Sequence, residues 1–186
     1  LPIWGQEAEL LASDAAGLAT FGSSVAVVGN TALIGAMRTT TGGGFAAGKV
    51  YVFARSGASW TESTTLTAPD GAAGDFFGTS MAMSAGTGVV GADGDDSGAG
   101  SAYVFVSGGG TWAPQTKLMA SDQAPNFCFG VSVAVSGDTA LVGSKWVSAP
   151  GAVEAGAAYV FVRSGTMWSE EEKLGAADRM AGDHFG

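Results

Sequence analysis

Three carboxylates within four residues form the segment of the sequence with the clearest capacity for chemistry. Asp93, Asp95 and Asp96 lie in the run Asp-Gly-Asp-Asp-Ser-Gly. Carboxylate oxygens are the ligands that hard cations such as Ca²⁺ prefer, but Asp and Gly are also ordinary turn residues. Segments 37–48 and 145–156, which occupy equivalent places, lack this run of acids. We therefore expect a solvated turn here, with a weak Ca²⁺ site as the alternative and no other cofactor.

The sequence does not indicate other arrangements of catalytic residues. His184 is the sole histidine and Cys128 the sole cysteine, and no pattern places them together as a nucleophile and its base. One cysteine excludes an internal disulfide, and a buried, inert thiol is the simplest interpretation of Cys128. The run 170–172, Glu-Glu-Glu, is interpreted as a solvated strand edge that discourages edge pairing. We predict that the protein is not an enzyme.

Composition and charge narrow the choice of partners. The net charge is −9 with only eight basic residues, which disfavours nucleic acid and anionic membranes, because both attract clustered Lys and Arg. The 31 glycines, 46% apolar residues and 13% charged residues indicate a tightly turned β protein rather than a disordered chain. No apolar run approaches the roughly 20 residues of a membrane-spanning helix. We expect protein partners or copies of this chain, no nucleic acid and no membrane insertion.

One pattern recurs four times and sets the architecture in which these residues must lie. It consists of Trp, Leu six residues later, Asp four after that, and Phe-Gly seven further on, with Trp-to-Trp spacings of 56, 52 and 56 residues. A fixed period of this size predicts an array of one supersecondary unit. The copies are Trp4, Leu10, Asp14, Phe21 and Gly22; Trp60, Leu66, Asp70, Phe77 and Gly78; Trp112, Leu118, Asp122, Phe129 and Gly130; and Trp168, Leu174, Asp178, Phe185 and Gly186.

Each full unit predicts four short antiparallel strands, because runs of period two alternate with glycine-containing turns. Gly-Asn and Gly-Asp pairs between the first two strands suit tight hairpins. The third strand carries Tyr and Phe on one face and Val on the other, so both of its faces require a cover. Successive sheets that stack face to face, as β-propeller blades do, provide that cover. The predicted strands are 79–84, 88–92, 101–106 and 112–118 in the second unit, and 131–135, 139–143, 157–163 and 168–174 in the third.

The chain thus divides as a single repeat array over 1–186. We expect the end of a preceding blade and a link at 1–22, blade units at 23–78 and 79–130, and a third unit at 131–186 that ends at the start of a further unit. The predicted fold is all-β, about three blades of a partial propeller with flanking strands.

The recurring polar and aromatic residues have structural roles in this interpretation. The repeat Trp residues are expected to cover blade edges, with the indole N–H free for a partner. The repeat Asp residues follow the outer strand, where a carboxylate typically accepts hydrogen bonds from nearby backbone N–H groups. Trp146 lies outside the repeat pattern, in the long loop of the third unit. It is therefore the candidate for an exposed binding residue on a loop.

At this level of detail the sequence resembles the FG-GAP repeat of integrin α-chain propellers and of many bacterial and algal surface proteins. Phe-Gly is followed by Ser-Val-Ala-Val, then by a Gly-Ala step at Gly35-Ala36, Gly91-Ala92 and Gly143-Ser144, and then by Gly-x-x-Tyr-Val-Phe. The resemblance covers essentially the whole chain. It implies a β-propeller fold and a location outside the cell or at its surface, while the same blade serves several functions.

The sequence departs from this family at one site. Members that bind calcium carry an Asp-rich loop between the first two strands of a blade, whereas this chain has room only for a hairpin of two or three residues there. Ca²⁺ takes six to eight oxygen ligands. The integrin-type calcium site is therefore not expected.

Two functions from different classes remain open. The first is a non-enzymatic structural or adhesive protein outside the cell, whose blades assemble with further blades or copies, for example as a fibre. Uncovered faces at both ends of a repeat array favour it, because terminal repeats require caps. The second is a ligand- or glycan-binding propeller module attached to an enzyme or receptor. The variable loops around Trp146 and Asp95 would then carry the site.

Overall fold

The computed structural model describes residues 7–15 and 17–186, so Trp4 lies outside the described residues. Its strands form three antiparallel sheets of four, each in chain order. The predicted all-β class with four-stranded blades is confirmed. The first blade contains β1 (Val25–Val28), β2 (Thr31–Ala36), β3 (Lys49–Ser56) and β4 (Ser59–Leu66); the second β5 (Met81–Ser84), β6 (Thr87–Ala92), β7 (Ser101–Gly108) and β8 (Thr111–Leu118); the third β9 (Phe129–Ser136), β10 (Thr139–Ser144), β11 (Ala157–Ser164) and β12 (Met167–Leu174).

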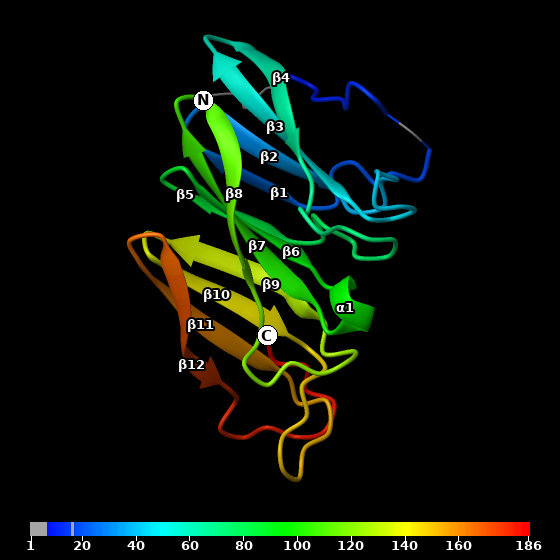
Figure 1. The fold of residues 1–186 in the computed structure, drawn as a ribbon, viewed down its shortest axis with the longest axis vertical. Helices are drawn as coiled ribbons and strands as arrows, with labels where there is room; N and C mark the ends of the chain where they lie inside the picture. The colour runs from blue at the N-terminus through cyan, green and yellow to red at the C-terminus, as the bar shows by residue number, and fades with distance from the viewer. Residues whose placement is uncertain (1–6, 16) are drawn as a thin grey trace, which may run out of the picture.

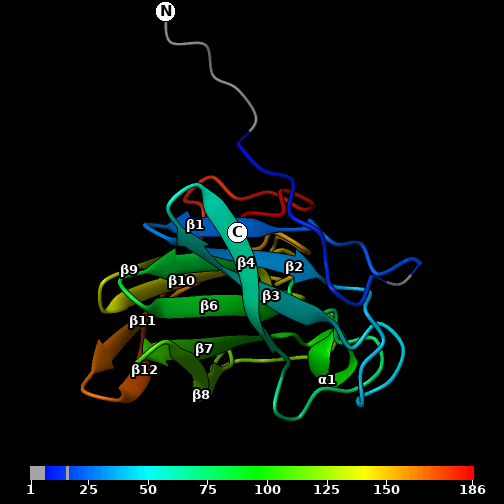
Figure 2. The ribbon, with the colours of Figure 1, turned by 90° about the horizontal axis from the view of Figure 1, so that it is seen from above.

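The three blades lie one upon the next along the long axis of the molecule, and within the described residues they do not close into a ring (Figure 1). The view from above shows the strands of successive blades superposed (Figure 2). One apolar cluster fills the space between the first and second blades and another the space between the second and third. The core is therefore a set of layers between sheets, as the apolar faces of the third strands predict.

The two ends of each blade differ in their connections. Two residues join the first strand to the second in every blade, as predicted, and Gly29, Gly86 and Gly137 have positive φ there. The longer loops between the second and third strands lie at the opposite end with the links between blades (Figure 1). In the second blade this loop forms the short turn α1 (Asp95–Gly98). In the first and third blades it is longer and contains a small bridge, Thr41 to Gly44 and Ala149 to Ala152.

Each of the two Phe-Gly steps between described blades, at Phe77 and at Phe129, contacts both of its neighbouring blades. The backbone N–H of Phe77 donates to the carbonyl of Ala47 in the preceding blade at 3.1 Å, and that of Phe129 donates to Ala99 at 3.0 Å. The Phe77 ring makes an edge contact with Tyr103 in the following blade, with ring centroids 5.6 Å apart. The backbone of this step therefore holds the blade before it, and the ring holds the blade after it.

The backbone at this step is restricted to an unusual conformation. The residue before Phe has positive φ in every copy, although none of the four is Gly. The opposing glycine of the preceding blade, such as Gly100 against Phe129, also has positive φ and leaves no space for a Cβ atom, which would collide with the Phe129 carbonyl. Gly is therefore required at this position for two reasons, conformation and space. The residues before Phe are Thr20, Phe76, Cys128 and His184.

Residues 7–22 precede the first blade and take the place that a link occupies elsewhere. Residues 7–15 and 17–22 contain no strand. The predicted blade end within 1–22 also includes residues 1–6, which lie outside the described residues, so it stays a prediction. Leu10, Ala12 and Phe21 lie against the first blade, around the buried side chains of Tyr51 and Phe53.

Replacement of Gly100 by Ala tests the close approach at the Phe-Gly step. We expect Gly100→Ala to lower the free energy of unfolding by about 3 kcal/mol or more, because it adds a steric collision to an unfavourable φ. Gly109→Ala is the matched control, since Gly109 has φ +60° in open space, and should cost only about 1 kcal/mol. Urea unfolding measures both losses, and equal losses would contradict the close approach.

Candidate functional site

The repeat Asp residues Asp14, Asp70 and Asp122 bind side chains of the following blade, in addition to any contact with the backbone of their own turn. Asp14 accepts a hydrogen bond from the Tyr51 hydroxyl at 2.5 Å and pairs with Lys49 at 2.5 Å. In the next junction Asp70 accepts from the Tyr103 hydroxyl at 2.7 Å and pairs with Lys117 at 2.8 Å. The third junction repeats the contacts with Asp122, Tyr159 at 2.8 Å and Lys173 at 2.5 Å. The predicted backbone donors are therefore not the principal partners of these carboxylates.

The lysine reaches the carboxylate from two different strands. Lys49 opens β3, two residues before Tyr51. Lys117 and Lys173 lie instead near the ends of the outer strands, directly across from Tyr103 and Tyr159 in the strand register. In all three junctions the ammonium also lies 5.4 to 5.5 Å from the centroid of the tyrosine ring. The positive charge thus lies in the same place in all three junctions, although the lysine that carries it comes from a different strand in the first blade.

These contacts shift the pKa of each partner in a consistent direction. Hydrogen bonds from Lys49 and Tyr51 lower the pKa of Asp14. At Asp70, burial raises the pKa of the carboxyl. The hydrogen bonds from Lys117 and Tyr103 lower the pKa by more, so the net change is a decrease. Burial and the adjacent carboxylates raise the pKa of Tyr103. Each link is therefore held by a carboxylate that is ionised at neutral pH and a tyrosine that keeps its proton.

The acidic run of the second blade does not converge on one point. Asp95 is buried, pairs with Lys117 at 2.7 Å and accepts from the Tyr103 hydroxyl at 2.9 Å. Asp96 is exposed and lies 3.3 Å from the same ammonium. Burial raises the pKa of Asp93, whose surroundings include Thr79 and Lys145 rather than Lys117. Among the described residues no group of three or more acidic, His or Cys side chains is placed to hold a metal ion.

The three repeat tryptophans among the described residues, Trp60, Trp112 and Trp168, are half-buried against the chain that precedes their own outer strands. Trp168 donates its indole N–H to the side-chain oxygen of Gln115, in the outer strand of the second blade, at 2.8 Å. Arg163 lies over the Trp168 ring at 5.2 Å. Trp112 joins the apolar cluster between the first two blades, and Trp60 joins the cluster that residues 7–22 complete.

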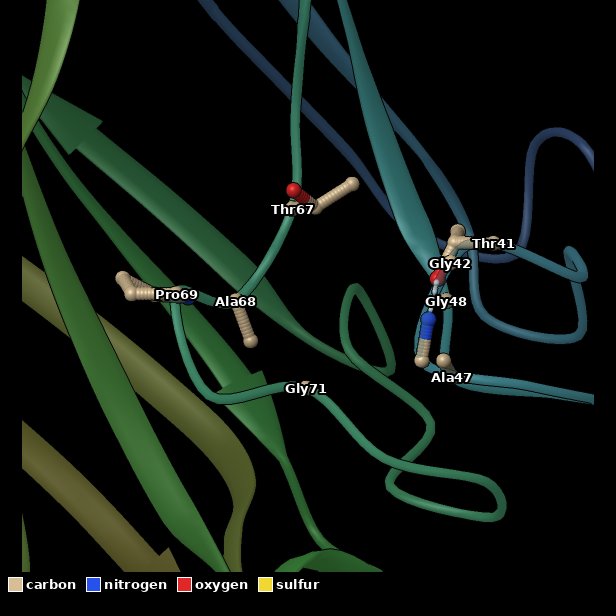
Figure 3. Close-up of a pocket in the computed structure, with 9 residues that line it drawn as sticks. Thr41, Gly42, Ala47, Gly48, Thr67, Ala68, Pro69 and Gly71 are labelled. Atoms are coloured by element: carbon tan, nitrogen blue, oxygen red, sulfur yellow. Dashed lines mark hydrogen bonds between the residues drawn. The ribbon is translucent and has the colours of Figure 1, made fainter.

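Besides a cleft of about 320 Å³ lined by Asp70, Tyr103 and Lys117, two further clefts lie among the loops and links of the described residues. One, of about 300 Å³, separates the loop 41–48 from the link 67–71 and is lined by Thr, Ala, Pro and Gly residues without a charged side chain. Figure 3 shows Thr41 and Gly48 on one wall and Pro69 and Gly71 on the other. Its lining offers backbone groups and two hydroxyls, and no acid or base.

The second cleft, of about 450 Å³, lies between residues 125–128, at the end of the second unit, and residues 146–154 of the third unit, and Trp146 lines it. Phe127, Asn126 and Cys128 form one wall and Ser148 and Glu154 contribute polar groups. The Trp146 and His184 rings are in edge contact, 4.5 Å apart. Cys128 is half-buried, and burial together with the Asp93 carboxylate raises the pKa of its thiol. This site thus combines an aromatic wall with neutral and acidic hydrogen-bonding groups.

The third blade differs from the others because its far face has no cover in this structure. Leu141 is 40% exposed, whereas Leu33 and Val89, which stand in the corresponding strands of the first two blades, are 0% exposed. Phe185 is also 40% exposed, whereas Phe77 and Phe129 are 0% exposed. The backbone of Phe185 still bonds to Ala155 at 2.9 Å, as its counterparts do. The Phe185 backbone therefore bonds to the blade before it, and among the described residues no further blade contacts its ring.

The profile of the FG-GAP repeat matches residues 4–53, 60–105 and 112–161. Each matched repeat begins at the recurring Trp and ends at the Phe of a third strand, and the matches cover most of the chain. The chain therefore belongs to the FG-GAP repeat family, and its resemblance to that family is confirmed. Comparison with curated proteins gives no significant match. Within the described residues, no helix has the length and apolar character needed to span a membrane.

Replacement of Asp70 by Asn tests whether the charge of this carboxylate stabilises the fold, because the effect of the variant on the free energy of unfolding should then depend on pH. A carboxyl whose pKa is lower in the folded state stabilises the fold above its unfolded pKa of about 3.9, and this contribution disappears as the pH falls through the folded value. We expect Asp70→Asn to cost about 1 kcal/mol at pH 7, since half of the carboxylate is exposed and solvent screens the pair. In urea unfolding, the cost should shrink progressively as the pH falls below about 3.9 and the Asp70 carboxylate takes up a proton.

Asp178→Asn is the matched control for Asp70→Asn. Asp178 has the same place in the repeat, is exposed, and takes part in none of the ion pairs formed by the described residues. This variant should leave stability within about 0.5 kcal/mol of the original protein. A loss at Asp70 that persisted at low pH would show that the charge is not its cause.

Proposed function

We propose that this protein is a non-enzymatic structural or adhesive component outside the cell or at its surface. FG-GAP repeats form binding modules in propeller-like folds and usually occur in extracellular domains, and this chain is a member of that family. Its blades would pack face to face, and the array would assemble with further blades or with copies of itself. The acidic net charge of −9 suits a soluble surface that associates through defined faces.

The observation that carries this proposal is the open face of the third blade. Leu141, Val160 and Ala158 occupy the positions whose counterparts are buried in both internal junctions. A shallow depression beside Leu141 is lined by Val133, Ala134 and Ala158 as well. An apolar face of this kind on a repeat array normally carries a cap or a partner.

Leu141→Asp tests whether this face assembles. We expect the original protein to show a weight-average mass that rises with concentration in sedimentation equilibrium, and Leu141→Asp to raise the dissociation constant at least about 100-fold, because the partner would bury a charge. Met167→Asp is the matched control, since Met167 is exposed but lies at the hairpin between β11 and β12. A protein that stays monomeric up to about 1 mM, or equal effects of the two variants, would contradict assembly through this face.

The cleft at Trp146 favours a second candidate function, a glycan- or ligand-binding module. An aromatic ring beside amide, hydroxyl and carboxylate groups suits a polar ligand with one apolar surface, and the cleft volume of about 450 Å³ suits a small molecule. In this case Trp146→Ala should remove binding on a glycan array, while Phe45→Ala, which removes an exposed aromatic from the corresponding loop of the first blade, should not. Retention of the same ligands by both variants would exclude this cleft as the site.

A further inference from the structure

The cleft of about 320 Å³ lies between the outer strand β8 and the link that precedes the second blade. In Figure 3 the ring of Pro69 points away from the loop 41–48, so the link lies between this cleft and the one drawn there. The cleft is lined by two prolines, Pro69 from the link and Pro114 from β8, and by Asp70, Tyr103 and Lys117.

In the other two junctions a serine of the link is bound to a glutamate of the outer strand. Ser13 donates from its backbone N–H and its hydroxyl to the Glu62 carboxylate, each at 2.9 Å. Ser121 forms the same two bonds with Glu170, both at 2.8 Å. These bonds tie the link to the outer strand at the point that corresponds to the cleft.

The second blade has a proline at both of these positions. Pro69 stands where the repeat otherwise has the serine, and Pro114 stands where it has the glutamate. Proline has no backbone N–H and no polar side-chain atom, so neither of the two bonds can form. The cleft is therefore a specific feature of this blade, produced by two substitutions within the repeat.

The charged groups at the cleft leave negative charge in excess. The Lys117 ammonium lies 2.8 Å from Asp70, 2.7 Å from Asp95 and 3.3 Å from Asp96. An ammonium group has three donors, and three carboxylates surround this one, so the lysine is not available to an anionic ligand. The Asp70 side chain is 52% exposed and can accept further hydrogen bonds. The field in the cleft thus favours a cation.

The walls of the cleft are apolar and rigid. The two proline rings lose almost no side-chain entropy when a ligand covers them. The Tyr103 ring is 2% exposed, and its hydroxyl is held by Asp70 at 2.7 Å and Asp95 at 2.9 Å. A flat apolar group can therefore bury area here without first ordering the residues that it contacts.

We propose that this cleft is a binding site for a small aromatic amine, whose ring packs against Pro69 and Pro114 and whose ammonium group binds the Asp70 carboxylate. Ligand sites have volumes of roughly 300 to 1,000 Å³, so a cleft of about 320 Å³ suits a single ring. The site goes beyond the proposed function, because it shares no residue with the open face of the third blade or with the cleft at Trp146.

The first experiment tests the chemistry of the ligand with tyramine as the probe. Titration of the isotope-labelled protein should shift the amide NMR signals of Gln115, Thr116 and Lys117, with a dissociation constant on the order of 1 mM. Butylamine, which lacks the ring, and 4-hydroxyphenylacetate, which carries a carboxylate in place of the amine, should each bind at least about tenfold more weakly. Equal binding of tyramine and 4-hydroxyphenylacetate, or unchanged signals up to about 20 mM tyramine, would overturn the proposal.

The second experiment closes the cleft with the residues of the other junctions. Pro69→Ser with Pro114→Glu introduces the serine and glutamate that tie the link to the outer strand elsewhere, and should weaken tyramine binding at least about tenfold. Because the variant also adds a carboxylate, attraction by charge alone would strengthen binding instead. Pro125→Ser is the matched control, since Pro125 belongs to the next link and lines the cleft at Trp146, and should leave tyramine binding unchanged. Equal affinities of the two variants would contradict a site between the two prolines.

Asp70→Asn tests the ammonium contact without changing the walls. It should weaken tyramine binding about fivefold and reduce the dependence of binding on salt concentration. Thermal unfolding shows whether each variant is folded. An affinity for tyramine that is unaffected by Asp70→Asn in the folded protein would show that this carboxylate does not bind the amine.

The same chemistry is offered by a free aromatic amine and by a tyrosine next to a lysine in a partner protein. Comparison of tyramine with the dipeptide acetyl-tyrosyl-lysine amide distinguishes the two sources. The size of the cleft predicts tighter binding of tyramine, whereas tighter binding of the dipeptide would support the site but assign it to a protein partner. A protein that binds tyramine and stays monomeric would retain this inference and contradict only the proposed assembly.

Discussion

Every blade of this protein carries apolar side chains on both faces, and the need to bury both faces shapes the rest of the structure. Full burial of one aliphatic side chain contributes about 1.5 to 3 kcal/mol. Leu33 and Val89 obtain that burial only because a following blade covers them, and Leu141, without a following blade, remains 40% exposed. A single blade is therefore incomplete, and an array of blades has two ends whose chemistry is set by the internal junctions.

The links between blades combine three contacts of different physical kinds. The backbone of Phe-Gly bonds to the loop of one blade, the Phe ring packs on the aromatic residues of the next, and a carboxylate binds a tyrosine and a lysine there. The aromatic packing supplies area, whereas the directional hydrogen bonds of the carboxylate fix the register. Movement of the lysine from β3 in the first blade to the outer strand in the others shows that the location of the positive charge is the constraint.

The strands, the tight hairpins and the stacking of blades follow from patterns in the sequence, because alternation, glycine turns and the two apolar faces of the third strand are local features. The side chains that bind Asp14, Asp70 and Asp122 do not follow from such patterns. The tyrosine alternates along its strand like an apolar core residue, and the lysine occupies different strands in different blades. The tyrosine and aspartate of each junction recur in phase, which is the signal from which the pair was predictable. The divergence of Asp93 from Asp95 and Asp96 depends on the turn geometry of α1, with φ +50° at Asp96, which no spacing rule predicts.

The central claim is that the open face of the third blade is one half of a blade junction. Electron microscopy of the 186-residue protein at high concentration tests it most directly. Rows of particles in which the stacking of blades continues from one copy into the next would show that copies complete each other's faces, as this account predicts. Isolated particles at every concentration, with the face of the third blade uncovered, would contradict it.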